Sequence, residues 1–370
     1  MTIESLVKEN IKSLKPYEVY SPLVGGRGVD ISCTVKLDAM ENPYDLPDEI
    51  KELVKEKISG FNRYPDPQAL DLRKTIASYL GVNKEEVMVG NGSDELILNI
   101  LLTFKSNQVV YPTPTFAMYK ILAQITNSNP VGIPLSSEFE LDDEGILKAT
   151  KNAPSIIFLA YPNNPTGNGF SKEKMLRIVE ESNALIIIDE AYFEFSKETF
   201  LSLIDIYDRV IILRTFSKAF GLAGLRCGYL VAHPELVKAL LKVKLPYNLN
   251  SFSQVVAGCV MENFRYLVQP QINQIITQRE RLFLFLKRTI GIIPYPSDAN
   301  FILFKTTKIP ANTIFSDLVE EGVLIRNLTE DLPDCNEASL LEASFLRVTV
   351  GSEQENNTFM EKLDGICRKY

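Results

Sequence analysis

The hydrophobic positions of this chain divide its central part into alternating helical and strand-like segments. Helical patterns occupy four stretches, namely 47–58, 68–80, 93–104 and 171–182. Short apolar runs that indicate strands occupy 87–89, 108–111, 155–160, 184–189, 210–213 and 226–232. The run 185–188 shows no polar alternation, so both faces of its sheet must be covered. The pattern therefore predicts an α/β fold with a mostly parallel central sheet and helices on both faces.

The pattern changes near residue 250 and again before residue 46. From residue 251, two long helical stretches are followed by short strands at 300–304, 322–326 and 345–350, mixed with helices. We therefore expect a large domain over residues 46–250 and a smaller α+β domain over residues 251–370. Residues 16–47 are rich in proline, glycine and tyrosine, and the first ten residues have the pattern of an amphipathic helix. Residues 1–45 are expected to form an arm that packs on the small domain.

Composition excludes several classes of protein. The net charge of −8 argues against nucleic acid as a partner. The chain has no run of 18 apolar residues and no signal-peptide core at its start, so we expect a cytoplasmic protein without a membrane span. The five cysteines are scattered without a C-x-x-C pair, which is typical of a reducing compartment and no structural zinc. The single histidine, His233, precedes Pro234 and is interpreted as structural, so no metal site is expected and acid–base chemistry must come from other side chains.

Lys218 is the first candidate for chemistry. It follows the apolar run 209–214 and lies between Phe216 and Phe220. An apolar setting disfavours the ammonium form and makes a nucleophilic amine available near neutral pH. A single lysine beside apolar residues more often caps a loop, so this interpretation depends on the residues that the fold brings next to it.

Four polar segments lie at the ends of predicted strands. They are 91–95, 161–167, 189–192 and 217–218. In an open parallel sheet, ligands bind at the carboxyl ends of the strands. We therefore expect the four segments to meet along one rim of the sheet and to form one ligand site.

One end of this site suits a phosphate. The segment Gly90-Asn-Gly-Ser-Asp-Glu95 would leave free backbone N–H groups and the positive end of a helix dipole near Ser93 and Asp94. Either of these two residues could instead simply cap the helix. Arg226 can bind a phosphate or a carboxylate through two parallel hydrogen bonds.

The other rim residues suit a flat ring that contains a nitrogen. Asp189 ends an apolar strand, where an unpaired carboxylate is unfavourable, so it needs a protein cation or a ligand nitrogen. Tyr192 could present its hydroxyl to the same ligand, and Asn163 could donate an amide hydrogen bond. Phe116 offers a face for stacking, although a single aromatic residue is more often part of a core. A phosphate, a stacked ring, a protonated nitrogen, a phenolate oxygen and an aldehyde for Lys218 together describe pyridoxal 5′-phosphate.

Over nearly its whole length, the chain resembles the fold-type I pyridoxal-phosphate aminotransferases, and within them most closely the histidinol-phosphate aminotransferase subfamily. The matching motifs are Tyr64-Pro-Asp66, Gly90-Asn-Gly-Ser-Asp-Glu95, Tyr161-Pro-Asn-Asn-Pro-Thr-Gly167, Asp189-Glu-Ala-Tyr192, Ser217-Lys-Ala-Phe-Gly-Leu-Ala-Gly-Leu-Arg226, Leu324-Ile-Arg326 and Leu346-Arg-Val-Thr-Val-Gly351. The resemblance implies a transaminase of histidine biosynthesis. Such an enzyme exchanges the amino group between L-histidinol phosphate and 2-oxoglutarate, giving imidazole acetol phosphate and glutamate.

The resemblance also implies a role for each residue near the cofactor. Lys218, Asp189 and Tyr192 would be the catalytic residues: Lys218 carries the cofactor and Asp189 pairs with its ring nitrogen. Asn163 and Tyr192 would bind the phenolic oxygen. The remaining cofactor residues would be Phe116, which stacks on the ring, and Ser93, Asp94, Ser217 and Arg226, which hold the phosphate.

A second set of implied roles concerns the substrate and a partner subunit. Arg347 would bind the α-carboxylate of an amino-acid substrate or the corresponding end of histidinol phosphate. Arg326 and Tyr17 would bind the substrate phosphate, and Asn163 would border the substrate as well. Tyr64 would reach the cofactor phosphate from the partner subunit, which implies a homodimer with shared sites and an arm that also contacts the partner.

Two segments depart from the subfamily pattern. Asp38 and Met40 stand where asparagines are frequent, and the segment 331–341 is longer than usual between the two arginines. We expect neither departure to touch the cofactor residues, but both bear on the substrate. An aromatic amino-acid aminotransferase or a threonine-phosphate decarboxylase therefore stays open, as does a non-catalytic binding protein. A nucleotide-binding α/β protein is disfavoured because neither G-x-G-x-x-G after the first strand nor G-x-x-x-x-G-K-[ST] is present.

Overall fold

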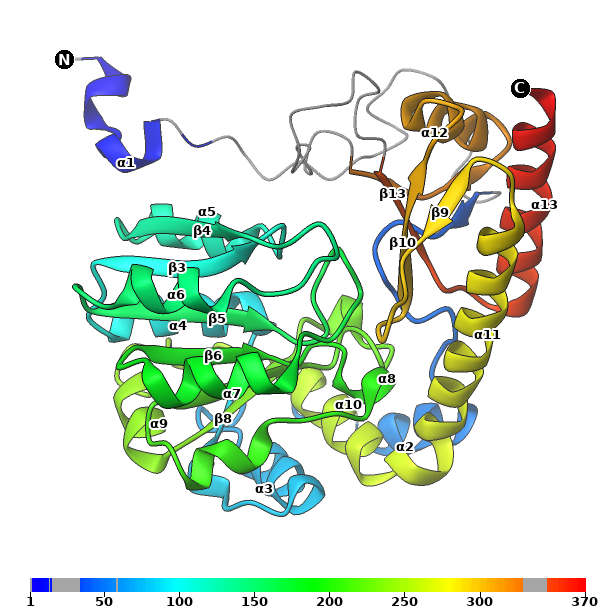
Figure 1. The fold of residues 1–370 in the computed structure, drawn as a ribbon. Helices are drawn as coiled ribbons and strands as arrows, with labels where there is room; N and C mark the ends of the chain where they lie inside the picture. The colour runs from blue at the N-terminus through cyan, green and yellow to red at the C-terminus, as the bar shows by residue number, and fades with distance from the viewer. Residues whose placement is uncertain (1, 13, 15–33, 58, 329–344) are drawn as a thin grey trace.

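The computed structural model of the chain describes residues 2–12, 14, 34–57, 59–328 and 345–370. A seven-stranded sheet forms its centre, in the order β2-β8-β7-β6-β5-β3-β4 (Figure 1). Its strands are β2 (Val87–Gly90), β3 (Gln108–Thr113), β4 (Asn129–Pro134), β5 (Ser155–Ala160), β6 (Leu185–Asp189), β7 (Val210–Thr215) and β8 (Gly228–Ala232). Strand β8 alone runs opposite to the other six strands of this sheet, so the predicted mostly parallel arrangement is confirmed.

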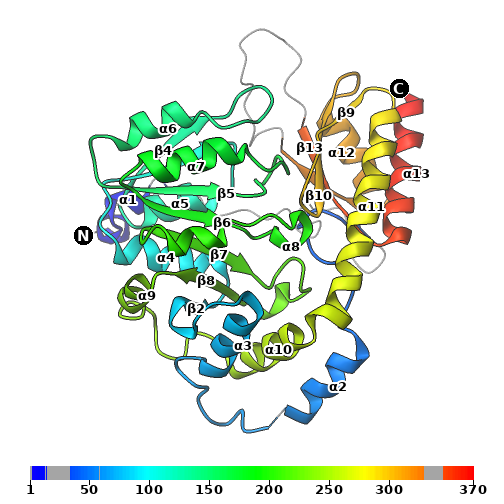
Figure 2. The same ribbon diagram turned by 60° about the horizontal axis from the view of Figure 1, so that its bottom comes forward.

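Helices cover both faces of this sheet, as the uniformly apolar strands predict (Figure 2). One face packs on α4 (Ser93–Thr103), α5 (Met118–Ile125) and α9 (Pro234–Leu240), and the other on α3 (Leu70–Leu80), α6 (Asp143–Thr150) and α7 (Lys172–Glu181). Strand β6 shows why both faces of the sheet need cover. Ile187 belongs to the first core, whereas Ile186 and Ile188 belong to the second, because successive side chains of a strand point to opposite faces.

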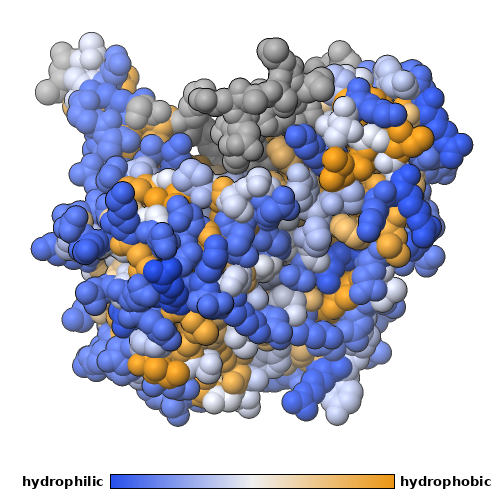
Figure 3. Space-filling model, viewed as in Figure 1, coloured by the Kyte–Doolittle hydropathy of each residue, from blue (hydrophilic) through white to orange (hydrophobic). Residues whose placement is uncertain are grey.

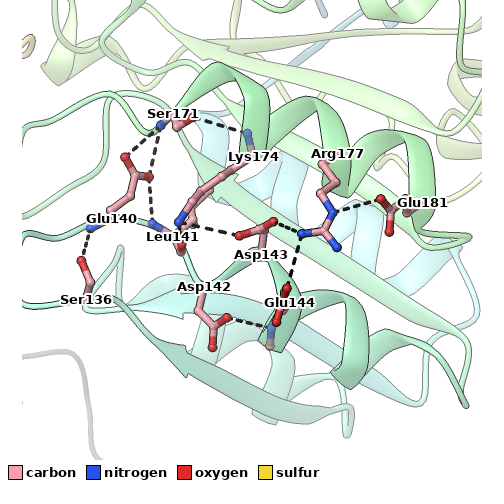
Figure 4. A network of polar contacts seen from close by, with 11 residues as sticks. Ser136, Glu140, Leu141, Asp142, Asp143, Glu144, Ser171, Lys174, Arg177 and Glu181 are labelled. Atoms are coloured by element: carbon pink, nitrogen blue, oxygen red, sulfur yellow. Dashed lines mark hydrogen bonds and ion pairs between the residues drawn. The ribbon is translucent and has the colours of Figure 1, made fainter.

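Polar contacts between α6 and α7 fix the outer layer of the second face (Figure 4). Arg177 on α7 pairs with Asp143 on α6 at 2.7 Å and with Glu181 at 3.0 Å. At the start of α7, the backbone N–H of Ser171 donates to Oε1 of Glu140 at 3.1 Å. The Arg177–Glu181 pair is exposed and contributes little to stability, whereas Asp143 is buried and needs its cationic partner. The structural effect of these contacts is to anchor the end of the loop that leads from β5 into α7.

The C-terminal part of the chain builds a second, antiparallel sheet in the order β12-β13-β10-β9. Its strands are β9 (Ile292–Pro294), β10 (Phe301–Thr306), β12 (Arg326–Asn327) and β13 (Phe345–Thr349), and its helices are α11 (Gln269–Arg288), α12 (Ala311–Glu320) and α13 (Glu353–Lys369). The helix α10 (Ser251–Glu262) packs against α2 (Asp48–Lys57) and α3, and the long helix α11 leads from there to the second sheet (Figure 2). The domain boundary near residue 250 stays a prediction.

The structure describes two parts of the predicted arm, and these two parts contact different regions of the fold. Strand β1 (Val35–Lys36) pairs in parallel with β11 (Val323–Leu324). Near the start of the chain, a 3₁₀ turn, η1 (Ile3–Leu6), precedes a single turn of helix, α1 (Glu9–Lys12), so the continuous amphipathic helix predicted there is wrong. Segments this short do not hold a helix by themselves. The side-chain amide of Asn10 attaches this turn to α5 by donating to the carbonyl of Gln124 at 2.8 Å.

The predicted helices and strands of the central part agree with the structure to within two residues at each end. The predicted elements do not include the helices α5, α6 and α9 or the edge strand β4. The sequence of β4, Asn-Pro-Val-Gly-Ile-Pro, contains two prolines and a glycine. Proline cannot donate to a strand ladder and is tolerated at a sheet edge, which is where β4 lies.

Candidate active site

The predicted rim residues meet at the carboxyl ends of neighbouring strands. Asp189 ends β6, in register with Ala160 of β5 and Leu213 of β7. Lys218 follows the end of β7 and Asn163 follows the end of β5. Because β8 is antiparallel to both β2 and β7, β2 ends on the same rim, and α4 begins directly after it.

Asp189 is a buried carboxylate with two hydrogen-bond donors. The hydroxyl of Tyr119 donates to Oδ2 at 2.7 Å, and the backbone N–H of Ala191 donates to Oδ1 at 3.1 Å. Burial raises the pKa of Asp189 to about 6, although both hydrogen bonds act in the opposite direction. Neither donor is a cation, so the carboxylate can still take a positively charged partner.

Lys218 is partly buried, and its ammonium group donates to the carbonyl oxygen of Ala39 at 3.0 Å. Its Nζ lies 6.0 Å from the centre of the Tyr192 ring. Burial, together with the positive charge of Arg347, lowers the pKa of Lys218 to about 8. The amine is therefore available as a nucleophile near neutral pH, as the sequence around it predicts.

The segment 38–40 touches the predicted cofactor residues, so the expectation that its departures stay away from them is wrong. The hydroxyl of Tyr192 donates to Sδ of Met40 at 3.3 Å, directly beside the Ala39 carbonyl that holds Lys218. The amide of Asn300 donates to the Met40 carbonyl at 3.0 Å. Met40 itself has a positive φ of 55°. The turn of residues 38–40 therefore lies in the site, between the rim of the central sheet and the second sheet.

At the predicted phosphate end, three polar side chains gather at the N-terminus of α4. Arg226 donates from Nη1 to Oγ of Ser217 at 3.2 Å and pairs through Nη2 with Asp94 at 3.1 Å. Ser93 is the first residue of α4, and neither it nor Asp94 caps the helix, whose N-cap is Gly92. A Cβ atom on Gly92 would lie 2.8 Å from Nη2 of Arg226. The glycine therefore lets the guanidinium approach the helix N-terminus, an arrangement that suits a phosphate.

Asn163 and Phe116 are partly engaged by neighbouring side chains and loops. The amide of Asn163 is fully buried and donates to Pro114 O at 3.0 Å and to Thr166 Oγ1 at 2.8 Å. A hydrogen bond from Asn163 to a ring oxygen would replace one of these two. The ring of Phe116 meets that of Tyr119 edge-on at 5.6 Å.

The two predicted substrate arginines lie on neighbouring strands of the second sheet. Arg326 of β12 and Arg347 of β13 are directly opposite each other, so their side chains leave the same face of the sheet. Arg347 donates to Oδ1 of Asn164 at 2.6 Å and to the carbonyl of Asp38 at 3.0 Å. It therefore joins the second sheet to the rim and to the turn that holds Lys218. Tyr17 lies outside the described residues.

Tyr64 points away from this arrangement. Its side chain is 80% exposed, and its ring stacks on that of Tyr247 at 4.4 Å with an angle of 20°. The role predicted for it, reaching the phosphate of a partner subunit, depends on a second chain and stays a prediction.

Sequence reasoning missed several functional neighbours of the site. Tyr119 holds Asp189 across 70 positions of sequence. Glu190 and Arg214, at the ends of β6 and β7, form a fully buried ion pair at 2.7 Å. The signal available in the sequence was a second charged residue, Glu190, directly after Asp189 at the end of a strand. Because successive residues of a strand point to opposite faces, the two carboxylates need different partners.

His233 is structural, as predicted, because its Nδ1 accepts a hydrogen bond from the backbone N–H of Glu235 at the start of α9. Within the described ranges, no helix is both long and apolar enough to cross a membrane. The face of the molecule in Figure 3 is mostly hydrophilic, with small apolar areas between charged side chains.

Known proteins resemble this chain in sequence and in fold. A profile of the family described as "Aminotransferase class I and II" matches residues 33–363. The histidinol-phosphate aminotransferase of Thermoanaerobacter pseudethanolicus is 40% identical over 366 residues, which cover 98% of each chain. The solved histidinol-phosphate aminotransferase from Clostridium acetobutylicum has a TM-score of 0.81 at 26% identity, covering 90% of this chain and 99% of that one. The Sinorhizobium meliloti enzyme of the same name, solved in complex with pyridoxal 5′-phosphate, has a TM-score of 0.81 at 22% identity, covering 95% of this chain and 98% of that one.

The chain belongs to the class I and II aminotransferases. The resemblance inferred from the motifs is thereby confirmed, together with the fold-type I architecture, the transaminase class of activity and the cofactor pyridoxal 5′-phosphate.

Proposed function

We propose that this protein exchanges the amino group between L-histidinol phosphate and 2-oxoglutarate. The observation that carries the proposal is the pairing of Arg326 with Arg347 across two strands, together with the hydrogen bond of Arg347 to the turn that holds Lys218. A guanidinium fork binds a phosphate or a carboxylate equally well. Two such groups side by side suit a site that must accept a phosphorylated amine and a dicarboxylic oxo acid in turn. The 40% identity to a relative named for this reaction supports the same substrates.

The rim residues fit pyridoxal 5′-phosphate in charge and in order. The N-terminus of α4, Ser217 and Arg226 would hold the phosphate, and the Asp189 carboxylate would pair with the ring nitrogen. Lys218 would hold the aldehyde carbon, and Tyr192 would address the phenolic oxygen. When bound, the cofactor supplies an electron sink for the α-carbon of the substrate.

The residues of the chain would manage the protons. Because burial lowers the pKa of Lys218 to about 8, its neutral amine is accessible near neutral pH, and in that form it can take a proton from the substrate α-carbon. Asp189, with a pKa of about 6, is mostly ionised at pH 7 and can keep a proton on the ring nitrogen. The Ala39 carbonyl and the Met40 sulfur orient Lys218 and Tyr192.

The proposal includes a cytoplasmic homodimer. Around Tyr64, a group of large apolar side chains is exposed, comprising Phe61, Tyr64, Leu245, Tyr247 and Phe252. Phe61 meets Phe252 edge-on at 6.1 Å, and Tyr64 stacks on Tyr247. Clustered exposed apolar residues mark interaction surfaces. A second copy on this surface would cover these rings and carry its own Tyr64 toward the phosphate end of the site.

A substrate panel tests the proposal. The holoenzyme is assayed with 2-oxoglutarate and, in turn, histidinol phosphate, phenylalanine and threonine phosphate, with glutamate and carbon dioxide both measured. We expect kcat/KM for histidinol phosphate to exceed that for phenylalanine by at least about tenfold, the effect of roughly 1.4 kcal/mol of added transition-state binding. A preference for phenylalanine, or release of carbon dioxide from threonine phosphate, would assign one of the alternative activities instead.

A further inference from the structure

Met40 lies in the candidate active site, although it is not a predicted cofactor or substrate residue. Its backbone is fixed on both sides, because its N–H donates to Oγ1 of Thr349 at 2.9 Å and its carbonyl accepts from Asn300 at 3.0 Å. The two residues before it hold Arg347 and Lys218 through their carbonyl oxygens. The side chain of Met40 therefore leaves the backbone at a fixed point of the site.

The backbone conformation at position 40 does not favour methionine. Its φ of 55° lies in the left-handed region, which asparagine and glycine adopt more readily than a residue with a long side chain. An unfavourable conformation that is kept at a functional site indicates a role for the residue that adopts it. The side chain of Met40 is where that role has to lie.

The thioether of Met40 contacts the candidate catalytic tyrosine. The hydroxyl of Tyr192 donates to Sδ of Met40 at 3.3 Å. A thioether is a weak acceptor, so the hydroxyl can leave it for the phenolic oxygen of the cofactor. A stronger acceptor at the same place would keep the hydroxyl and withdraw it from the cofactor. Oxidation of the sulfur produces such an acceptor, because a sulfoxide is polar and a thioether is not.

Met40 is also accessible to a small oxidant. Three other methionines are at most 3% exposed, namely Met88, Met175 and Met261. Met40 is half-buried, and so are Met118 and Met360. Among the methionines that the structure describes, the feature that distinguishes Met40 is its hydrogen bond with Tyr192.

We propose that Met40 is a site of reversible oxidation, at which a peroxide lowers the transaminase activity of this protein. The sulfur lone pair attacks one oxygen of hydrogen peroxide, and the O–O bond breaks. The sulfur loses two electrons and gains that oxygen, and the departing hydroxide takes the proton left on it and becomes water. The new S=O group accepts the hydrogen bond from Tyr192 beside the carbonyl that holds Lys218. The loss of activity rests on the role proposed for Tyr192 at the cofactor.

Peroxide treatment of the holoenzyme tests the proposal. After graded treatment, catalase removes the excess peroxide, and the rate is measured with the amine that the untreated protein uses best, so the test does not depend on the proposed substrate. Peptide mass spectrometry gives the fraction of Met40 that carries an added oxygen. We expect the rate to fall in step with that fraction, by about fivefold at full oxidation, the effect of losing one hydrogen bond. Methionine sulfoxide reductase, which does not reduce oxidised cysteines, should restore both the original mass and the rate.

Two variants separate Met40 from other oxidation sites, each compared with its own untreated sample. Met40→Leu keeps an apolar side chain without a sulfur, so its rate should survive the treatment that inactivates the wild type. Met360→Leu, a matched change of a half-buried methionine on α13, should stay as sensitive as the wild type.

Four outcomes would overturn the proposal. They are a Met40 that resists peroxide at concentrations that oxidise Met360, complete oxidation of Met40 with an unchanged rate, a loss in Met40→Leu equal to that in the wild type, and a reductase that restores the mass without the rate. If Met40→Leu does not fold, the treatment and rescue of the wild type decide.

Discussion

The hydroxyl of Tyr119 donates a hydrogen bond of 2.7 Å to Oδ2 of Asp189, and both side chains are buried. The two residues come from α5 and from the end of β6, so a helix on one face of the sheet orients the carboxylate proposed to hold the cofactor nitrogen. The hydrogen bond also opposes the rise in the pKa of Asp189 that burial causes.

Replacing Tyr119 by Phe should shift the acid limb of the pH–rate profile to higher pH. Without the hydroxyl, one cause that lowers the pKa of Asp189 is lost, so the carboxylate takes up its proton at a higher pH than in the wild type. We also expect kcat to fall about fivefold near pH 6 and less at pH 8. Tyr111→Phe, a matched change of another buried tyrosine on β3, should leave the profile in place. An unshifted acid limb in Tyr119→Phe would show that the hydrogen bond does not tune Asp189.

Replacing Asp189 by Asn should lower kcat by more than about tenfold at every pH. The amide cannot keep a proton on the ring nitrogen, and losing a close charged partner is worth more than roughly 1.4 kcal/mol. Asp143→Asn at the start of α6, a buried carboxylate that pairs with Arg177 and Lys174 and is not a predicted cofactor residue, serves as the control and should keep normal turnover. A normal rate for Asp189→Asn would remove this residue from the mechanism.

Much of this arrangement could be predicted from the sequence because local patterns determine it. The uniformly apolar strands β5, β6 and β7 require cover on both faces, and parallel strands bring the residues that follow them to one rim. This pattern therefore predicts that Asp189 and Lys218 lie close together. Strand β4 escaped prediction because its two prolines mask the pattern, and only its position at the sheet edge makes them tolerable.

Contacts between distant segments could not be predicted in this way. Nothing in the sequence near Met40 indicates that it touches Tyr192, 152 positions away. The same holds for Glu194, which looks like an ordinary helix glutamate until the fold buries it among Tyr79, Phe193 and Phe264. Such contacts depend on how the two sheets and their helices pack together, and local sequence patterns do not predict that packing.

Replacing Arg326 by Ala should raise KM for histidinol phosphate more than for phenylalanine. A guanidinium–phosphate contact contributes about 1.5–3 kcal/mol, so we expect KM for the phosphorylated amine to rise by at least about tenfold. Arg326→Lys keeps the charge but not the planar fork, and it should show an intermediate effect. Steady-state kinetics with both substrates checks this, and equal changes for the two would argue against phosphate recognition by Arg326.

Replacing Glu194 by Gln should stabilise the protein above pH 7. The pKa of this carboxyl rises from 4.5 to about 7 on folding, so the folded state holds its proton more tightly and its stability falls as pH increases from 4.5 to 7. The amide avoids this loss, which amounts to at most about 3 kcal/mol. Urea unfolding at pH 5 and pH 8 should therefore show a larger gain for the variant at pH 8. A variant less stable than wild type at pH 8 would mean that the ionised carboxylate is satisfied in the protein alone.

The most direct test of the whole account asks which amine carries the cofactor. The holoenzyme is reduced with sodium borohydride, digested, and its peptides are analysed by mass spectrometry. We expect the added mass of the reduced cofactor on the peptide that contains Lys218 and its loss in Lys218→Ala, together with the loss of the visible absorbance and of turnover. Labelling of a different lysine, or a Lys218→Ala variant that keeps the absorbance and normal activity, would contradict the central claim.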